Sequence, residues 1–216
     1  MFNLSIASVL YRVVTLLIAF TVHEFSHAYV ADRYGDDTPR MAGRLTLNPL
    51  AHIDPLGALM LVVAGFGWAK PVPINPYTLR RRSESAVMWV SVAGPLSNLV
   101  LAIFGSLIFL VLWTPMQGTA MATTGFTGIL IEFLYFFIII NLSLMVFNLL
   151  PIAPLDGEKV LEFFLPPSGK DFLANIRPYG SILLLVVIFL LPSIGFDVLG
   201  AILRPVLTTW MNFLVG

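Results

Sequence analysis

Residues 12–32, RVVTLLIAFTVHEFSHAYVAD, consist of an apolar run that lies between two charged residues. As an α-helix, the run would rise about 1.5 Å per residue and cover roughly the 30 Å thickness of the hydrocarbon core of a bilayer. The only ionisable side chains inside it are those of His23, Glu24 and His27. Such groups are costly in a membrane and normally face a protein interior or a water-filled cavity. The run therefore predicts a membrane helix that carries a buried polar site.

The spacing of the two histidines indicates that this site can bind a metal ion. Residues i and i+4 lie on one face of a helix, so His23 and His27 can bind a single zinc ion with Glu24 beside it. The alternative is a set of polar residues that pack against other helices without a metal. Catalytic zinc usually takes three protein ligands and a water molecule, so the site needs one further residue.

The composition excludes several classes of protein. The chain has 216 residues, of which 58% are hydrophobic and 11% charged, whereas about a quarter of a soluble domain is charged. The formal net charge is zero, which argues against a nucleic-acid partner. There is no cysteine, so a bound metal must use His, Asp or Glu. We expect one integral membrane domain over residues 1–216, with the lipid bilayer as its main partner.

The apolar segments predict an all-α polytopic membrane protein with four to six transmembrane helices. Four segments are long enough to cross the bilayer, at about 13–31, 86–112, 126–150 and 179–203. Residues 198–215 form either an interfacial helix or another crossing. Residues 56–69 are too short for an ordinary crossing, and we expect a re-entrant segment there. The catalytic core would span about 13–160, followed by membrane helices at about 179–215.

Two segments before the second crossing are expected to be extended. Residues 43–49 alternate in polarity, and residues 70–76 contain three prolines, which fix φ and remove hydrogen-bond donors. The two segments could pair as a small β-hairpin-like element near the cytoplasmic interface. Residues 72–77 are a candidate for adding a strand to an unwound substrate.

The charges of the connections predict the orientation. Residues 32–85 contain seven Lys or Arg residues and residues 152–179 contain three, whereas residues 114–125 contain none. By the positive-inside rule, the connections at 32–85 and 152–179 are cytoplasmic. The paired histidines would then lie below the cytoplasmic surface, and water would reach them through a cavity.

A third ligand is available in the segment NLLPIAPLDG at residues 148–157. Pro151 and Pro154 end the preceding helix, and unwound backbone at membrane depth is tolerated where it lines a buried cavity. Asp156 follows on the same side of the membrane as the histidines. The alternative is a helix-capping aspartate, because the residues from Glu158 onward look helical. Spacing alone leaves both interpretations open.

Two motifs, in this order and in membrane helices, resemble the site-2 protease family of intramembrane zinc metalloproteases. They are His23-Glu24-x-x-His27 and Asn148-x-x-Pro151-x-Pro154-x-Asp156-Gly157. The segments GRLTLNP at 43–49 and AGPLSN at 93–98 resemble the short bacterial and archaeal branch of that family, which has no PDZ or regulatory domain. The resemblance covers about residues 13–160. One departure is Glu158-Lys159, where many members carry a small residue or an arginine.

The resemblance implies one Zn²⁺ ion per chain, held by His23, His27 and Asp156. It also implies that Glu24 is the catalytic base and that Asn148 lies near the reacting carbonyl. The implied activity is the hydrolysis of peptide bonds within or near transmembrane helices of membrane-protein substrates.

A competing interpretation is a metal-binding membrane protein without proteolysis, such as a zinc transporter or an inactive scaffold. A transporter needs polar residues on several helices to form a path for the ion. In this chain the polar residues are concentrated at one end of two membrane helices. An inactive relative would normally lack the glutamate or one of the ligands, and all four residues are present.

Three other groups of polar residues are expected to be structural. We expect His52 and Asp54 to form a hydrogen-bonded pair that supports a turn, in preference to a second metal site. Asn98 would hold the metal-bearing helix or line the cavity, and Asn141 would serve packing.

Overall fold

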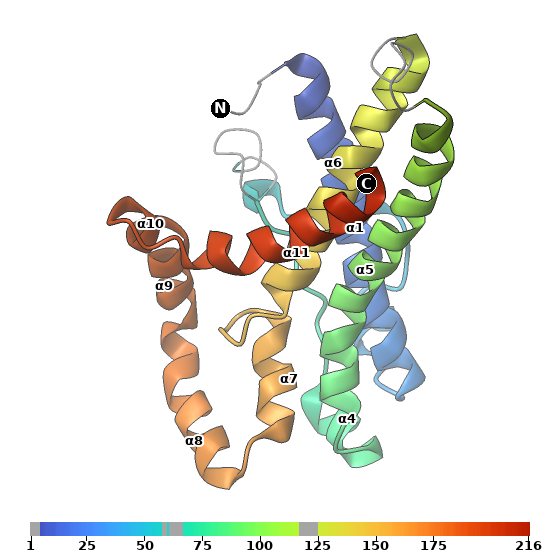
Figure 1. Ribbon diagram of the computed structural model, residues 1–216. Helices are drawn as coiled ribbons and strands as arrows, with labels where there is room; N and C mark the ends of the chain where they lie inside the picture. The colour runs from blue at the N-terminus through green and yellow to red at the C-terminus, as the bar shows by residue number, and fades with distance from the viewer. Residues whose placement is uncertain (1–4, 58–59, 61–66, 117–124) are drawn as a thin grey trace.

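The computed structural model describes residues 5–57, 60, 67–116 and 125–216. Three long helices lie side by side: α1 (Ile6–Arg33), α5 (Ala86–Trp113) and α6 (Gly125–Asn148) (Figure 1). Within the described residues the secondary structure is helical, with no strand and one isolated β-bridge. The three-helix bundle carries His23, Glu24 and Asn98, which are discussed below.

Helix α1 is longer than the apolar run that predicts it. It begins at Ile6, where the side chain of Ser5 accepts a hydrogen bond from the Ser8 amide at 3.1 Å. Arg12, expected just outside the membrane helix, lies inside α1 with its guanidinium carbon 5.2 Å from the centre of the Phe136 ring. The charge packs over an aromatic face of α6, and therefore it does not end the helix.

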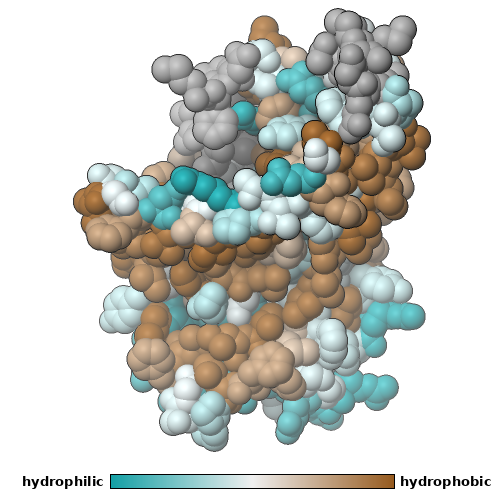
Figure 2. All heavy atoms as spheres, viewed as in Figure 1, coloured by the Kyte–Doolittle hydropathy of each residue, from teal (hydrophilic) through white to brown (hydrophobic). Residues whose placement is uncertain are grey.

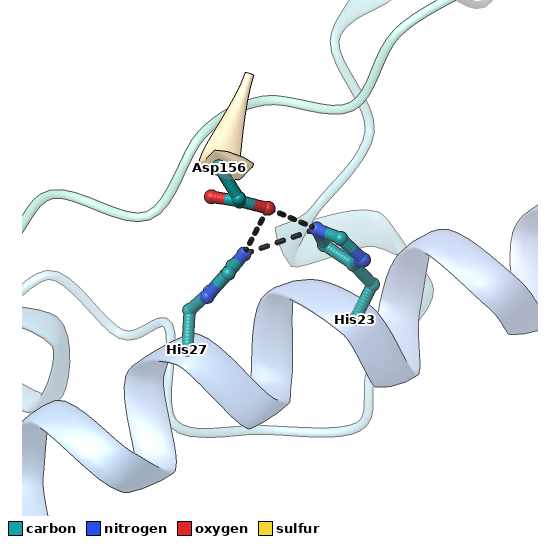
Figure 3. A group of neighbouring side chains, drawn as sticks. All are labelled: His23, His27 and Asp156. Carbon is teal, nitrogen blue, oxygen red and sulfur yellow. Dashed lines mark hydrogen bonds and ion pairs between the residues drawn. The ribbon is translucent and has the colours of Figure 1, made fainter. Parts of the chain in front are cut away.

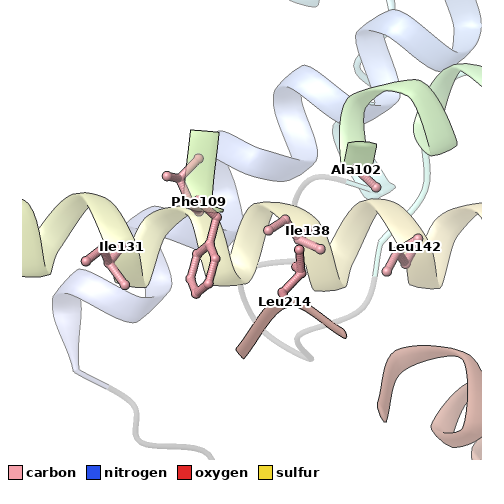
Figure 4. Packing of buried hydrophobic residues seen from close by; sticks show 7 residues of the cluster. Ala102, Phe109, Ile131, Ile138, Leu142 and Leu214 are labelled. Atoms are coloured by element: carbon pink, nitrogen blue, oxygen red, sulfur yellow. The ribbon is translucent and has the colours of Figure 1, made fainter. Parts of the chain in front are cut away.

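The hydrophobic core of the bundle lies between α5, α6 and the last helix, α11 (Val198–Val215) (Figure 4). Its buried members are Ala102, Phe109, Ile131, Leu134, Ile138, Leu142 and Leu214. A second, smaller cluster lies at the C-terminal end of α1 and consists of Ala31, Leu79, Ala86, Val87 and Val90. The two clusters fix α5 against both of its neighbours.

After α6 the chain forms a separate helical arm before α11 crosses back over the bundle (Figure 1). The elements in order are α7 (Asp156–Phe164), α8 (Pro167–Ile176), η4 (Arg177–Tyr179), α9 (Gly180–Leu185), the π-helical η5 (Val186–Leu190) and α10 (Leu191–Ser193). The expected crossing at 179–203 is therefore wrong in its bounds. The chain breaks after Ser193 because Gly195 has a positive φ of 95° and Asp197 caps α11, accepting from the Gly200 amide at 2.8 Å.

Between α1 and α5 lie the short elements α2 (Thr38–Met41), η1 (Pro49–Ala51) and α4 (Pro76–Arg82), and η2 (Thr114–Met116) follows α5. The expected pairing of residues 43–49 with 70–76 is wrong. The isolated bridge instead joins Ile53 to Ala69, and the Lys70 amide donates to the carbonyl of His52 at 2.9 Å. The prolines that follow lack the donors to continue a ladder, and α4 begins before Tyr77. Residues 58–59 and 61–66 of the expected re-entrant segment lie outside the described residues.

The surface of the protein is suited to a membrane. Five helical stretches among the described residues are long and apolar enough to cross one: Ile6–Arg33, Ala86–Trp113, Gly125–Asn148, Pro167–Ser193 and Val198–Val215. Hydrophobic residues cover much of the visible face (Figure 2). On α5 alone, Val100, Phe104, Leu107 and Val111 form an exposed stripe at helical spacing. Apolar patches of this extent need a partner, and lipid supplies it. The prediction of an all-α polytopic membrane fold is confirmed.

Helix α11 runs across α6 and α5, whereas the other long helices run beside one another (Figure 1). The indole nitrogen of Trp210 donates to the Ser106 hydroxyl at 2.9 Å, and Leu214 enters the bundle core. Hydrophilic residues gather along one side of the band where α11 lies (Figure 2). Val198–Val215 is also long and apolar enough to cross a membrane, so the interfacial helix and the further crossing both stay predictions.

Candidate metal centre

Three side chains from two distant parts of the chain meet at the inner face of α1 (Figure 3). The Nε2 atoms of His23 and His27, one helical turn apart, are separated by 3.0 Å. Each lies 3.2 Å from Oδ2 of Asp156, the first residue of α7. All three residues are buried, and they form the one cluster of three or more potential metal ligands among the described residues.

The other nitrogen of each imidazole is occupied by α5. Nδ1 of His23 lies 2.7 Å from the side-chain oxygen of Asn98, and Nδ1 of His27 lies 2.6 Å from the Val90 carbonyl. Both partners are acceptors, so a proton on each Nδ1 satisfies these contacts, and a neutral ring in that tautomer would turn the Nε2 lone pair towards Asp156. In that tautomer two lone pairs and a carboxylate oxygen face one another, an arrangement that a bound cation would stabilise.

The dimensions of the cluster fit zinc. Ligand atoms about 2.0–2.1 Å from a tetrahedral ion lie about 3.3 Å from one another. The three separations here are 3.0, 3.2 and 3.2 Å. The space in front of the imidazoles is kept clear by Gly94 of α5, because a Cβ atom built there would overlap both Nε2 atoms. Two imidazoles and a carboxylate are also a donor set that zinc prefers.

Asp156 reaches the imidazoles because the chain turns sharply after α6. The Ile152 amide donates to the Leu150 carbonyl at 2.8 Å, and the Leu155 amide donates to the Ile152 carbonyl at 2.9 Å. A Cβ atom on Gly157 would overlap the carbonyl of Leu149, so this close turn requires glycine. Leu155, and not Asp156, occupies the capping position of α7, and no side chain caps it. The helix-capping alternative for Asp156 is therefore wrong.

A chain of buried amides connects the centre to all three bundle helices. The Asn98 amide nitrogen donates to the side-chain oxygen of Asn141 at 3.0 Å and to the Ala19 carbonyl at 3.4 Å. Asn141 in turn donates to the Phe137 carbonyl at 2.8 Å, and both asparagines are completely buried. Asn98 thus holds the metal-bearing helix, one of its two expected roles. Its direct bond to His23 was not expected from the sequence, nor were the contributions of Val90 and Gly94.

Glu24 and Asn148, the expected catalytic residues, differ in their surroundings. Glu24 is buried beside His23, and its Oε2 accepts a hydrogen bond from the Val72 amide at 2.9 Å. The side chain of Asn148 donates to the Leu144 carbonyl of its own helix at 3.0 Å. Its one described hydrogen bond is therefore to its own helix, and its catalytic role stays a prediction.

His52 and Asp54 do not form the expected pair. Nε2 of His52 lies 2.8 Å from the Thr46 carbonyl, while its other ring nitrogen has no hydrogen-bond partner. Oδ1 of Asp54 accepts from the Gly57 amide at 2.8 Å. Each residue stabilises the local backbone separately, and neither belongs to a cluster of three potential ligands among the residues described.

A buried cluster of two imidazoles and a carboxylate on a membrane helix, with a glutamate next to the first histidine, defines a membrane-embedded metallopeptidase. A model of Peptidase family M50, the site-2 proteases, matches residues 11–191. The chain therefore belongs to this family, and the resemblance noted in the sequence is confirmed. It is an integral membrane metallopeptidase of a zinc-dependent family.

Several named proteins are similar to this chain. The "Putative zinc metalloprotease YwhC" of Bacillus subtilis is 45% identical over 177 residues, which cover 82% of this chain and 79% of that protein. A protein of the same description, Rip2 of Mycolicibacterium smegmatis, is 34% identical and is matched over 83% of this chain and 66% of its own length. MJ0611 of Methanocaldococcus jannaschii, also so described, is 30% identical over 74% of each chain. No solved structure matches the chain.

Proposed function

We propose that this protein hydrolyses peptide bonds within or near the transmembrane helices of membrane-protein substrates, with one zinc ion held by His23, His27 and Asp156. The observation that carries the proposal is the convergence of three potential ligand atoms at tetrahedral spacing inside a lipid-facing helical bundle. A hydrolytic centre at such a site meets substrates that are themselves in the bilayer. Membrane-protein clearance and regulated proteolysis are both functions that this chemistry can serve.

In the proposed reaction each residue of the centre has a separate task. Bound zinc would supply Lewis-acid activation of water and of the scissile carbonyl. Glu24 accepts the proton of the attacking water and passes it to the leaving amine. Asn98 and the Val90 carbonyl keep both imidazoles in the tautomer that offers Nε2. The Asn148 amide would have to leave the Leu144 carbonyl before it could donate to the substrate.

The substrate must present an unwound peptide bond. A membrane helix shields its backbone within its own hydrogen-bonded turns, so cleavage is favoured near helix-breaking residues. We place the centre towards the cytoplasmic side, because the connections that flank it contain the Lys and Arg residues. The chain has no native cysteine, so single cysteines at Arg81 and Thr114 can be labelled with an impermeant thiol reagent. Labelling of Arg81→Cys from the cytoplasmic side and of Thr114→Cys from the outside would support this orientation, and the reverse result would exclude it.

The proposal is tested with purified protein in liposomes and a reconstituted transmembrane-helix substrate. Wild type should cleave the substrate, and Glu24→Gln should abolish cleavage while zinc content stays at one ion per chain. Glu84→Gln, an exposed glutamate before α5, is the matched control and should cleave normally. Zinc flux into the same liposomes tests the transporter interpretation. Zinc uptake without proteolysis, unaffected by Glu24→Gln, would overturn the proposed function.

A further inference from the structure

The segment Lys70–Asn75, which we call the strap, contacts α1 at Glu24. The amide of Val72 donates to Oε2 of Glu24 at 2.9 Å, across 48 positions of sequence. The side chains of Val72 and Ile74 are half-buried, whereas those of Pro71 and Pro73 are exposed. The strap is therefore an extended segment that turns one edge and one set of side chains towards the protein.

Two prolines make the Val72 amide distinctive. Pro71 and Pro73 have no N–H group, so Val72 is the one residue of this Pro-Val-Pro sequence that can donate a backbone hydrogen bond. The rings also fix φ on both sides of Val72, which reduces the number of conformations that the strap can adopt. A donor on a stiff segment can hold its acceptor in one place.

Buried charges anchor the strap at both ends. At its start, the guanidinium of Arg44 donates to the Lys70 carbonyl, and the Lys70 amide donates to the His52 carbonyl at 2.9 Å. Arg44 is 4% exposed. Burial lowers the pKa of its guanidinium, and the charge of Glu24 opposes that shift. A buried cation therefore holds the strap close to the carboxylate that its Val72 amide contacts.

At the other end, Oδ2 of Asp36 accepts from the Asn75 amide at 2.6 Å. Its Oδ1 accepts from the amide and the hydroxyl of Thr38 at 3.1 and 2.6 Å, so the carboxylate is held rigidly. Asp36 is 1% exposed. Ile74, one residue before Asn75, packs against the smaller hydrophobic cluster at the end of α1. The strap is thus fixed on each side of the Val72 amide.

We propose that the strap positions Glu24 for catalysis through the Val72 amide. This inference rests on the proposed function. A glutamate side chain has three rotatable bonds, and a bond to Oε2 leaves Oε1 with a defined direction for accepting a proton. Small displacements of a reacting group can lower rates by roughly 10²-fold. Val72 is a positioning residue in this account, because its amide acts on Glu24 and not on the substrate.

The direct test removes one hydrogen-bond donor. Replacing Val72 with its α-hydroxy acid analogue changes the amide to an ester and deletes the donor with little change of shape. We expect kcat to fall about tenfold or more with KM and zinc content unchanged, the pattern of an interaction used only in the transition state. Val72→Ala keeps the N–H group, so it should lower kcat less than the ester replacement does. An ester variant as active as wild type would refute the positioning role, and a faster one would show that the strap restrains the enzyme instead.

A second pair of variants tests the anchor. Asp36→Ala should lower kcat because the strap loses its hold at Asn75, whereas Asp37→Ala, its exposed neighbour, should not. Thermal unfolding and zinc content identify any Asp36→Ala sample that has not folded. In that case the ester variant alone tests whether the strap positions Glu24. The two proposals fail differently. Activity in Glu24→Gln would refute the proposed function, whereas an inactive Glu24→Gln beside a fully active ester variant would refute the strap inference alone.

Discussion

Nδ1 of His23 and the side-chain oxygen of Asn98 are 2.7 Å apart, and this bond joins α1 to α5 directly at the candidate metal centre. Asn98 also donates to Asn141 of α6. The orientation of one imidazole is thereby set by a network that spans the whole bundle. Partners of this kind fix the tautomer and direction of a metal ligand without touching the metal.

Removing the Asn98 side chain should weaken the centre without abolishing it. We expect Asn98→Ala to lower zinc affinity by about 10- to 100-fold, since the loss of such a partner has effects of that size. Competition with a chelator of known affinity measures the change. Ser97→Ala, its half-buried neighbour on α5, is the control and should bind zinc normally. Equal affinity in Asn98→Ala and wild type would mean that His23 does not need this bond.

Adding a single methyl group at Gly94 should exclude the metal. A Cβ atom there overlaps Nε2 of both imidazoles, so Gly94→Ala should contain no zinc and have no activity. The helix itself should be retained, because alanine favours helical structure more than glycine by about 1 kcal/mol. Metal analysis beside circular dichroism separates the two effects. Ala93→Ser, one residue away and lining a groove between α1 and α5, should keep its zinc.

Loss of the late aspartate should empty the centre. Asp156→Ala leaves two imidazoles and no carboxylate, so we expect zinc content after purification to fall well below one ion per chain and cleavage to cease. The exposed Asp171 offers a matched control, because Asp171→Ala removes the same charge away from the cluster. Full zinc occupancy in Asp156→Ala would show that the third ligand is another residue.

The helical arm should depend on Arg177 for its internal packing. This guanidinium lies 2.6 Å from Oε1 of Glu158 and 2.6 Å from Oε2 of Glu162, and Glu158 is buried. Arg177→Ala leaves a buried acceptor unpaired, at a cost of about 1–3 kcal/mol. The measurement is a lower midpoint of thermal unfolding in detergent. Arg204→Ala removes a more exposed pair with Asp197 and should change stability much less.

The sequence predicts the paired imidazoles well because helical spacing alone places His23 and His27 on one face. It also predicts three bundle helices from apolar length, which needs no tertiary information. The hydrogen-bond partner of His27 cannot be predicted in this way. A backbone carbonyl such as that of Val90 exists at every residue, so nothing in the sequence distinguishes it. Gly94 lies within the AGPLSN segment, but its purpose depends on which way α5 faces.

The misplaced fourth crossing has a local cause that the sequence does contain. Residues 179–203 are almost uniformly apolar, and length therefore dominates the prediction. Gly195 and Asp197 interrupt that run with the two residue types that favour a positive φ and a helix cap. Giving these turn signals more weight than hydropathy would have found the break. The position of Asp156, in contrast, has no local signal in the sequence, because it depends on a turn between distant helices.

Because α5 supplies the acceptors for both imidazoles, any axial slip of α5 against α1 would withdraw both acceptors together. A mismatch between hydrophobic length and bilayer thickness is accommodated in part by changes in helix tilt. We therefore expect the cleavage rate to depend on the thickness of the surrounding bilayer. Cleavage rates across a series of acyl-chain lengths would measure that dependence.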